Sequence, residues 1–304
     1  EETWPERRIL ALMSEHKILQ MPIVNSAGKV VGLFGVNHIL RTQKFENPVF
    51  LMAGGLGTRL RPLTNDCPKP MLQIGGKPIL WHIMKIFESY GINEFIVCCG
   101  YKGFFIKEYF DNYHLRNTDV TFNIKDNSSS ILRNTKENWL VTCVDTGDNT
   151  LTGGRLKKIK EFLDPHEPFL FTYGDGVGDI NIKNLLKFHK SHGKLATVTA
   201  VNPPGRFGIL KINESDDVTQ FNEKPDIGNA WINGGFFVLE PSVIDYISGD
   251  NISWEEEPLQ QITKDKQLSA YKHTGFWQPM DTIAEKKYLE ELYSSNEAPW
   301  KTWN

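Results

Sequence analysis

One short segment limits the possible folds more than any other part of this 304-residue chain. Residues 49–53 read Val-Phe-Leu-Met-Ala, an unbroken apolar run. Neighbouring side chains of a strand point to opposite faces, so the run predicts a strand buried on both faces, as in a parallel sheet covered by helices. It leads directly into the glycine-rich segment 54–59, so we expect the strand to end at that turn.

Similar apolar runs recur along the chain and alternate with helical patterns. We expect further strands at 94–99, 140–144, 169–173 and 195–201, and helices at 78–90, 104–113, 181–191 and 281–293. This alternation predicts an α/β fold: a Rossmann-like, mostly parallel mixed sheet flanked by helices. After about Gly205 the runs become shorter, so we expect a small strand-rich C-terminal part.

The first part of the chain has a different pattern, and we expect a division into 1–46 and 47–304. Apolar residues at helical spacing in 5–17 predict a helix, and two short strands around the turn 25–28 predict a hairpin. This order resembles the second half of a CBS domain, a module that usually works in pairs to sense adenine nucleotides.

The CBS-like segment departs from that family at two positions. Gly35 and Asn37 stand where the family usually carries a threonine and an aspartate that hold ribose. A structural appendage or a truncated module is therefore the alternative to a nucleotide sensor. The first residue is Glu1 rather than methionine, which leaves open whether the chain is a natural fusion or a truncated fragment.

Charge and composition argue against several kinds of partner. The net charge is −3, so a nucleic acid held by bulk electrostatics is not expected. No apolar run approaches the roughly 20 residues of a membrane helix, and no signal peptide is visible, so we expect a cytoplasmic protein without a membrane partner. The four cysteines form no C-x-x-C pair, which favours reduced thiols over a zinc or redox site.

The glycine-rich segment 54–59 is the strongest chemical signal. Glycines allow backbone N–H groups to approach phosphate oxygens, and Arg59 adds a planar cation that can bind phosphates at two points. Lys69, between Pro68 and Pro70, lies on a stiffened segment that could reach the same ligand. The segment alone could be a simple tight turn, and it lacks the ending of a Walker loop. Together with Pro-Lys-Pro it resembles the signature of nucleotidylyltransferases that activate sugar phosphates.

Two aspartates are candidate metal ligands. Asp175 lies between two glycines after the predicted strand 169–173, and open α/β sheets bind ligands at the carboxyl ends of strands. Magnesium takes carboxylate and phosphate oxygens together. A turn aspartate is the alternative for Asp175, and a helix N-cap is the alternative for Asp281. In the nucleotidylyltransferases that this chain resembles, aspartates at these two positions hold Mg²⁺ together.

A candidate sugar-phosphate site lies at Phe221-Asn-Glu-Lys-Pro. Glu223 can accept hydrogen bonds from sugar hydroxyls, and Lys224 can pair with a phosphate. A solvated surface pair is the alternative. In the wider superfamily an E-K-P near this position contacts the sugar phosphate.

From Gly75 onward the chain resembles glucose-1-phosphate cytidylyltransferases, on stretches that include 75–85, 203–208, 275–282 and 298–303. The resemblance implies an enzyme that transfers a cytidylyl group from CTP to α-D-glucose 1-phosphate, giving CDP-glucose and pyrophosphate. It also implies Mg²⁺ as cofactor and a homo-oligomer. In this family CDP-glucose usually feeds deoxysugars of bacterial surface polysaccharide, including lipopolysaccharide.

The resemblance further implies roles for individual residues. Arg59, Lys69 and Asp175 are expected to be catalytic, through positioning and charge neutralisation without a covalent intermediate. The residues expected to bind the nucleotide are Met52, Ala53, Gly54, Gly55, Leu56, Gly57, Thr58, Arg59, Lys69, Thr150, Arg155 and Gly174.

One stretch departs from the cytidylyltransferase pattern. Residues 61–67 read Arg-Pro-Leu-Thr-Asn-Asp-Cys, where cytidylyltransferases usually carry an acidic stretch. This version is similar to guanylyl- or thymidylyltransferases, including some that follow a CBS pair. A recombined gene is our hypothesis, which the same junction in contiguous DNA reads would support. A guanylyl- or thymidylyltransferase acting on another sugar 1-phosphate is the alternative enzyme. A non-catalytic nucleotide-sensing regulatory protein is the alternative of another class.

Overall fold

The computed structural model describes residues 13, 20–25, 27–35, 47–132, 137–202, 209–212, 217–222 and 231–303. The chain divides into two compact units, Glu1–Phe45 and Glu46–Asn304. In the first unit β1 (Gln20–Val24) and β2 (Val30–Gly35) form an antiparallel hairpin, which confirms the predicted hairpin. The predicted helix at 5–17 and the position of Asn37 lie outside the described residues, apart from Met13. The CBS resemblance stays a prediction.

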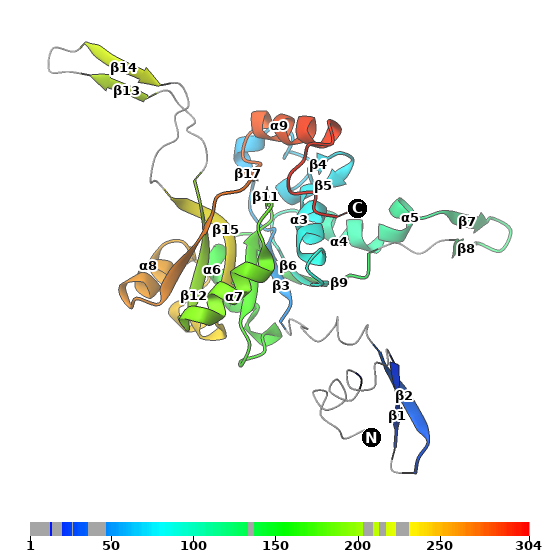
Figure 1. The fold of residues 1–304 in the computed structure, drawn as a ribbon. Helices are drawn as coiled ribbons and strands as arrows, with labels where there is room; N and C mark the ends of the chain where they lie inside the picture. Colours follow the sequence, from blue (N-terminus) through cyan, green and yellow to red (C-terminus); the bar gives the residue numbers. More distant parts are fainter. Residues whose placement is uncertain are drawn as a thin grey trace. The chain divides into compact units, whose positions relative to one another are not determined.

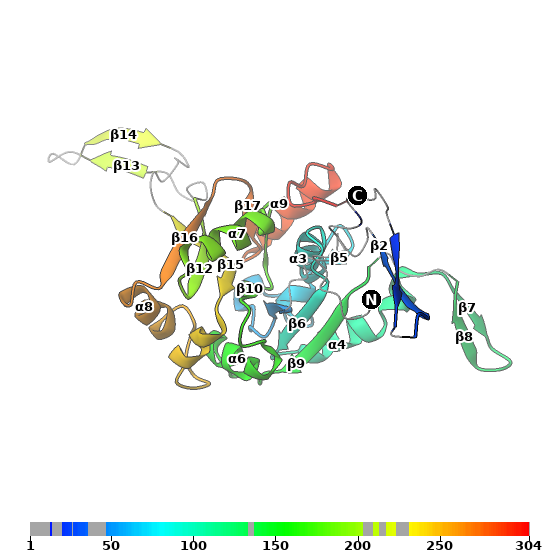
Figure 2. The ribbon, with the colours of Figure 1, turned by 60° about the horizontal axis from the view of Figure 1, so that its bottom comes forward.

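A seven-stranded sheet is the centre of the second unit, in the order β16-β12-β15-β10-β3-β6-β9 (Figures 1 and 2). Its strands are β3 (Val49–Met52), β6 (Glu94–Cys99), β9 (Leu140–Asp145), β10 (Phe169–Tyr173), β12 (Ala196–Val201), β15 (Ile232–Leu239) and β16 (Leu268–His273). Neighbouring strands are parallel except in the two pairs that contain β15. The predicted α/β fold with a mainly parallel sheet is confirmed.

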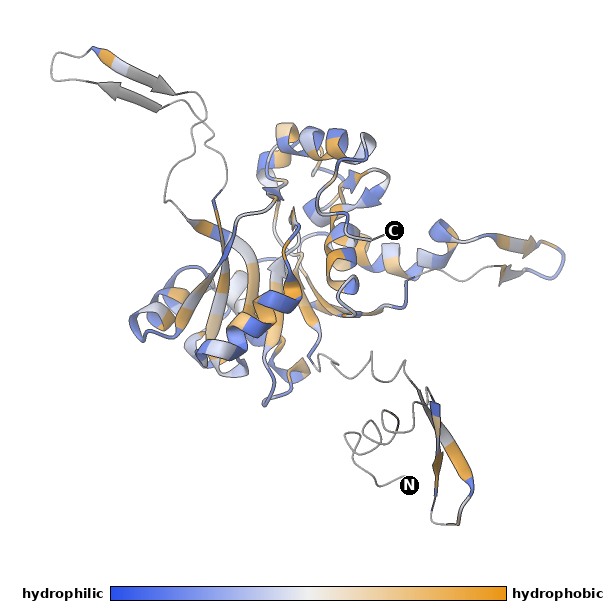
Figure 3. Ribbon diagram, in the orientation of Figure 1, coloured by the Kyte–Doolittle hydropathy of each residue, from blue (hydrophilic) through white to orange (hydrophobic). Residues whose placement is uncertain are grey.

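The apolar run that opens the sheet is buried as predicted. Val49, Phe50 and Leu51 have no exposed surface, and β3 lies between the parallel strands β10 and β6. Phe50 packs edge-to-face on Phe169 with ring centroids 5.2 Å apart. Burial of each such side chain contributes about 1.5–3 kcal/mol. Figure 3 shows the apolar residues concentrated along these central strands.

The predicted strand at 140–144 is present, but the prediction that it is buried is wrong. Strand β9 is the last in the sheet and pairs only with β6. Leu140 is 63% exposed, and the four residues that follow it are partly buried. An apolar run does not distinguish a central strand from an edge strand, because that depends on where the chain goes next.

Helices cover both faces of the sheet (Figure 2). The described helices are α3 (Ile79–Glu88), α4 (Gly103–Asp111), α5 (Tyr113–Asn117), α6 (Thr152–Lys158), α7 (Ile182–His192), α8 (Glu257–Lys264) and α9 (Ile283–Ser294). Helices α3 and α7 lie on the face of Phe236 and Thr197, and α6 and α8 lie on the face of Phe237. The four predicted helices are found at α3, α4, α7 and α9. None of the described helices is long and apolar enough to span a membrane.

The strands of the predicted strand-rich C-terminal part are divided among three sheets. Strands β15 and β16 enter the main sheet, on either side of β12. The smaller two-stranded sheets of the second unit are β4 (Gln73–Ile74) with β5 (Lys77–Pro78), β7 (Val120–Asn123) with β8 (Ser128–Ile131), β11 (Gly176–Gly178) with β17 (Trp277–Pro279), and β13 (Ile209–Ile212) with β14 (Val218–Asn222). Short 3₁₀ helices lie at Thr58–Leu60, Lys69–Met71, Lys160–Phe162 and Pro241–Tyr246.

The C-terminal segment packs on the sequence-distant helix α3. Trp300 has no exposed surface, and its indole N–H donates to Nδ1 of His82 at 3.4 Å. The other ring nitrogen of His82 lies 2.9 Å from the carbonyl oxygen of Ile74. A carbonyl only accepts and an indole N–H only donates, so the neutral ring carries its proton on Nε2. The segment 298–303 is thereby tied to the body of the second unit.

Candidate active site

The glycine-rich segment leaves the sheet at the carboxyl end of β3. The N–H of Ala53 still donates to the Cys98 carbonyl at 3.1 Å, and Gly54 is buried. Gly55 and Leu56 are exposed. The predicted nucleotide loop therefore begins where the sheet ends, with its backbone open to solvent from Gly55 onward.

Gly57 is the glycine of this loop that its conformation requires. Its φ is +59°, and a Cβ there would lie 3.1 Å from the Cβ of Lys69 and from Cγ2 of Thr64. Its carbonyl accepts the Thr64 hydroxyl at 2.9 Å. Thr64 is buried, so the unusual stretch 61–67 directly supports the turn that precedes Thr58 and Arg59.

The Pro-Lys-Pro segment holds Lys69 at the same strand ends. Pro68 and Pro70 are buried, and Lys69 begins a 3₁₀ turn. Pro70 packs near Gly174, whose N–H donates to the Met52 carbonyl at 2.9 Å. A Cβ on Gly174 would lie 2.7 Å from that carbonyl oxygen, so only glycine fits between the two strand ends.

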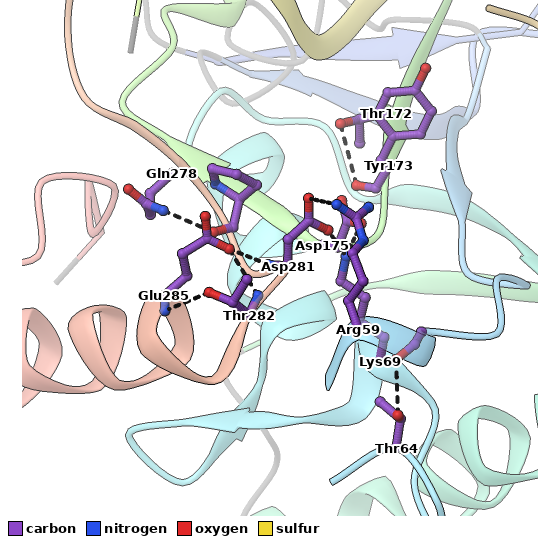
Figure 4. Close-up of polar contacts among 12 residues, drawn as sticks. Arg59, Thr64, Lys69, Thr172, Tyr173, Asp175, Gln278, Asp281, Thr282 and Glu285 are labelled. Atoms are coloured by element: carbon purple, nitrogen blue, oxygen red, sulfur yellow. Dashed lines mark hydrogen bonds and ion pairs between the residues drawn. The ribbon is translucent and has the colours of Figure 1, made fainter. Parts of the chain in front are cut away.

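Four predicted catalytic and metal-binding residues meet in one cluster (Figure 4). The Lys69 ammonium lies 2.5 Å from Oδ2 of Asp175 and 2.6 Å from Oδ1 of Asp281. The Arg59 guanidinium, 71% exposed, lies 3.1 Å from the other oxygen of Asp281. Burial by itself would lower the pKa of Lys69, but the ion pairs with Asp175 and Asp281 outweigh it and raise the pKa above its ordinary value. Lys69 is therefore fully charged at neutral pH.

Strand pairing explains how two aspartates so far apart in sequence come together. Strand β11 pairs antiparallel with β17, with Gly176 opposite Pro279. The ladder continues one step further, because the N–H of Met280 donates to the Asp175 carbonyl at 2.8 Å. Asp175 and Asp281 therefore leave the same end of this small sheet.

The alternative role for Asp281 as a helix N-cap is wrong. The N-cap of α9 is Thr282, whose side chain accepts from the N–H of Glu285 in a capping box. Glu285 in return accepts the N–H of Thr282 at 2.9 Å and that of Asp281 at 2.7 Å. The Asp281 carboxylate is thus directed into the site while its neighbour completes the helix end.

The two carboxylates fit a magnesium ion that is shared with phosphates. Two oxygens from separate aspartates already converge on one cation, the Lys69 ammonium. The described residues hold no group of three or more His, Cys, Asp or Glu side chains suited to a metal. A site with one or two carboxylates suits Mg²⁺, which takes its remaining ligands from phosphates and water.

Two further residues predicted to bind nucleotide lie beyond strand β9. Thr150 is buried, and its hydroxyl accepts from Lys158 at 3.2 Å. Arg155 is 4% exposed and donates to acceptors of the chain itself, the Gly54 carbonyl among them. The structure therefore places Arg155 behind the glycine-rich loop. Glu223 and Lys224 lie outside the described residues, directly after β14 ends at Asn222.

A polar chain beside the cluster was not predicted from the sequence. The Tyr173 hydroxyl donates to Glu255, and Glu255 also accepts the Thr152 hydroxyl at 2.6 Å. The Asn233 amide donates to the Tyr173 oxygen at 3.4 Å. Tyr173 precedes Gly174 and Asp175, so these hydrogen bonds hold the end of the strand that carries the candidate metal ligand Asp175. The sequence feature that could have indicated Glu255 is the acidic run at 255–257, which follows a tryptophan that is buried in the structure.

Comparisons with known proteins agree with this geometry. Residues 49–282 match the family model described as "Nucleotidyl transferase". The chain is 56% identical over 253 residues to the glucose-1-phosphate cytidylyltransferase of Salmonella typhi, covering 83% of this chain and 98% of that protein. It is 32% identical over 260 residues to mannose-1-phosphate guanylyltransferase 1 of Arabidopsis thaliana, covering 82% of this chain and 66% of that protein.

The solved structures include a related fold with a bound nucleotide analogue. HddC from Yersinia pseudotuberculosis, complexed with GMP-PN, superposes with a TM-score of 0.59 at 25% identity. The match covers 81% of this chain and 99% of that one.

Proposed function

Because the chain belongs to the nucleotidyl transferase family, we propose that it transfers a cytidylyl group from CTP to α-D-glucose 1-phosphate. The products would be CDP-glucose and pyrophosphate. The observation that carries the proposal is the 56% identity to the Salmonella typhi enzyme over 98% of that protein. The convergence of Lys69, Arg59 and the two aspartates supports it, because charge neutralisation is what phosphoryl chemistry requires.

The proposed reaction is a single in-line displacement. An oxygen of the sugar phosphate attacks the α-phosphorus of CTP, a new P–O bond forms, and the bond to the β-phosphate breaks as pyrophosphate leaves. No covalent enzyme intermediate is required. Lys69 is proposed to neutralise the crowded α-phosphate, and the exposed Arg59 to bind the departing pyrophosphate.

Asp175 and Asp281 are proposed to hold the magnesium ion. When bound, the ion would neutralise charge on the phosphate oxygens. The chain's own contribution is to keep two carboxylates on one side of the phosphates and two cationic side chains beside them. Lys69 lies between the carboxylates, and we propose that it contacts a phosphate bound at the exposed part of 55–59.

The remaining contacts are proposed from the resemblance. The backbone of 52–58, with Thr150 and Gly174, would surround the nucleotide. Glu223 and Lys224 would bind the sugar phosphate. A homo-oligomer is also proposed, and four large apolar side chains on and beside the β7–β8 hairpin support it, since they are 47–87% exposed: Phe122, Ile124, Ile131 and Leu132. Light scattering after gel filtration tests this assembly.

Base choice is tested by pyrophosphate release with glucose 1-phosphate, Mg²⁺ and either CTP, UTP, GTP or dTTP. A strong preference for CTP is expected. Preference for GTP or dTTP would replace the proposal by the guanylyl- or thymidylyltransferase alternative and would assign base choice to 61–67. The observation that favours that alternative is the hydrogen bond from Thr64 to the Gly57 carbonyl, which ties 61–67 to the loop proposed to bind the nucleotide. Nucleotide binding without pyrophosphate release would favour the alternative of a non-catalytic regulatory protein. The cluster of Arg59, Lys69, Asp175 and Asp281 argues against that alternative.

Residues 47–304 are proposed to suffice for catalysis, with 1–46 as the CBS-like segment. Deletion of 1–46 should leave kcat and KM for CTP within twofold. Loss of turnover in a folded deletion variant would contradict this division. The supply of deoxysugars for surface polysaccharide stays a prediction from the resemblance.

A further inference from the structure

Arg155 connects the ends of three neighbouring strands at the candidate site. It lies on α6, and its Nη1 donates to the Cys99 carbonyl at 3.1 Å and to the Thr146 hydroxyl. Its Nη2 donates to the Gly54 carbonyl at 3.1 Å and more weakly to the Asp148 carbonyl at 3.4 Å. These acceptors follow or end β3, β6 and β9, the parallel strands whose carboxyl ends form this edge of the sheet.

Two glycines leave the space that the guanidinium occupies. A Cβ on Gly54 would lie 2.3 Å from Cζ of Arg155, and a Cβ on Gly100 would lie 2.4 Å from its Nη1. Neither glycine has a positive φ. A side chain at Gly54 would therefore displace the Arg155 guanidinium, whereas Gly57 is favoured by its positive φ.

The bond to Gly54 determines the orientation of one peptide group in the loop. The Gly54–Gly55 peptide is trans, so its C=O and N–H point in opposite directions. With the carbonyl directed at the buried guanidinium, the N–H of Gly55 is directed away from it, and Gly55 is exposed. Glycine-rich turns bind phosphates through N–H groups directed in this way.

We propose that Arg155 is a positioning residue, which orients the Gly54–Gly55 peptide so that the Gly55 N–H binds the triphosphate. It acts through the loop rather than by touching the nucleotide. The inference rests on the proposed function only in assuming a triphosphate ligand. The Arg155 guanidinium is suited to this role because its several N–H groups can bind acceptors on separate strands at once. A lysine ammonium is less suited to bridging them.

The test measures binding of two probes, CTP and inorganic tripolyphosphate, each with Mg²⁺, by calorimetry on the full chain. Arg155→Met should weaken the binding of both probes by a similar factor, about tenfold to a hundredfold. Without the arginine the Gly55 N–H is no longer held toward the phosphate, and a hydrogen bond to a charged group is lost. Gly54→Ala, which keeps the arginine but displaces it, should weaken both probes in the same way. Arg155→Lys should not restore binding.

The control variant is Asn47→Ala. Asn47 is a buried cross-link in the same unit that accepts the N–H of Asp164 at 2.7 Å and donates to the Pro168 carbonyl at 3.2 Å. It should lower Tm and leave both dissociation constants unchanged. Equal losses of affinity in Asn47→Ala and Arg155→Met would mean that general destabilisation is the cause.

Three further results would overturn the proposal. Loss of CTP binding with tripolyphosphate binding unchanged would mean that Arg155 contacts the nucleoside directly. Recovery in Arg155→Lys would mean that its charge alone matters. Unchanged binding of both probes in folded Arg155→Met and Gly54→Ala would exclude the role. Failure of the proposed function is distinct, since wild-type chain would then bind tripolyphosphate but release no pyrophosphate from CTP.

Discussion

Lowering the pH from 7.5 to 4 should remove a stabilising contribution that comes from the buried, neutral His82. Its ring has no exposed surface and lies between the Ile74 carbonyl and the Trp300 indole. Burial lowers the pKa of His82 from its ordinary value of 6.5 to about 4, although the hydrogen bond to Ile74 opposes the shift. Between these values the unfolded chain binds a proton that the folded chain does not.

The magnitude follows from the size of the shift. Each unit of pKa difference corresponds to about 1.4 kcal/mol, so His82 contributes about 3 kcal/mol to the free energy of unfolding. Because the pKa of His82 is lower in the folded chain than in the unfolded chain, the free energy of unfolding falls as the pH falls. The contribution is complete above pH 6.5 and is lost as the pH falls toward 4. Protonation would also place a donor against the Trp300 N–H, so the C-terminal segment should detach first.

The assay is urea unfolding at several pH values between 7.5 and 4, for wild type and His82→Gln. Comparison with the variant cancels the titration of the other groups. The difference in unfolding free energy between the two proteins should shrink by about 3 kcal/mol over this range. A difference that stays constant with pH would refute the assignment of a buried neutral ring. His192→Gln, on a half-buried histidine, is the control and should show a much smaller change.

The remaining predictions concern the site and its supports. Lys69→Met should lower kcat at least about a hundredfold in the pyrophosphate assay. The same variant should bind Mn²⁺ more tightly without nucleotide, because a competing cation is gone; weaker binding would contradict the shared site. Asp175→Asn should abolish turnover with Tm nearly unchanged. Gly57→Ala should raise KM for CTP, since positive φ and a 3.1 Å contact oppose a side chain. Trp300→Ala should cost about 3–5 kcal/mol in urea unfolding.

Local sequence patterns predict the elements of this fold well where burial decides the pattern. The run at 49–53 could be assigned to a central strand because every side chain is apolar. The run at 140–144 is also mostly apolar, with Thr142 as its one polar side chain, but it forms an edge strand, since its position depends on the chain's later return to β10. The same limit applies to the C-terminal strands, whose pairing with β12 no local pattern encodes.

The candidate site shows the same division between local and distant information. Arg59, Lys69 and Asp175 could be named from the glycine-rich and proline-rich segments that hold them, whereas the metal-binding role of Asp281 was predicted only from the family resemblance. The convergence of Asp175 and Asp281 on the Lys69 ammonium required the pairing of β11 with β17. The nucleotide-binding role of Arg155 stays a prediction, and its close approach to Gly54 and Gly100 could not be predicted because it exists only in three dimensions. Glu255 was missed because it resembles any residue of an acidic surface run.

The pairing of β11 with β17 also has a consequence for biosynthesis. During synthesis Asp175 is added long before Asp281. Asp281 follows β17, the last short strand before α9, which pairs with β11. A nascent chain can therefore complete its glycine-rich loop and most of its sheet while it still lacks half of the paired carboxylates. If Asp175 and Asp281 hold the metal ion together, as proposed, a chain that ends before Asp281 should bind a nucleotide but not turn it over, because one of the two carboxylates is missing.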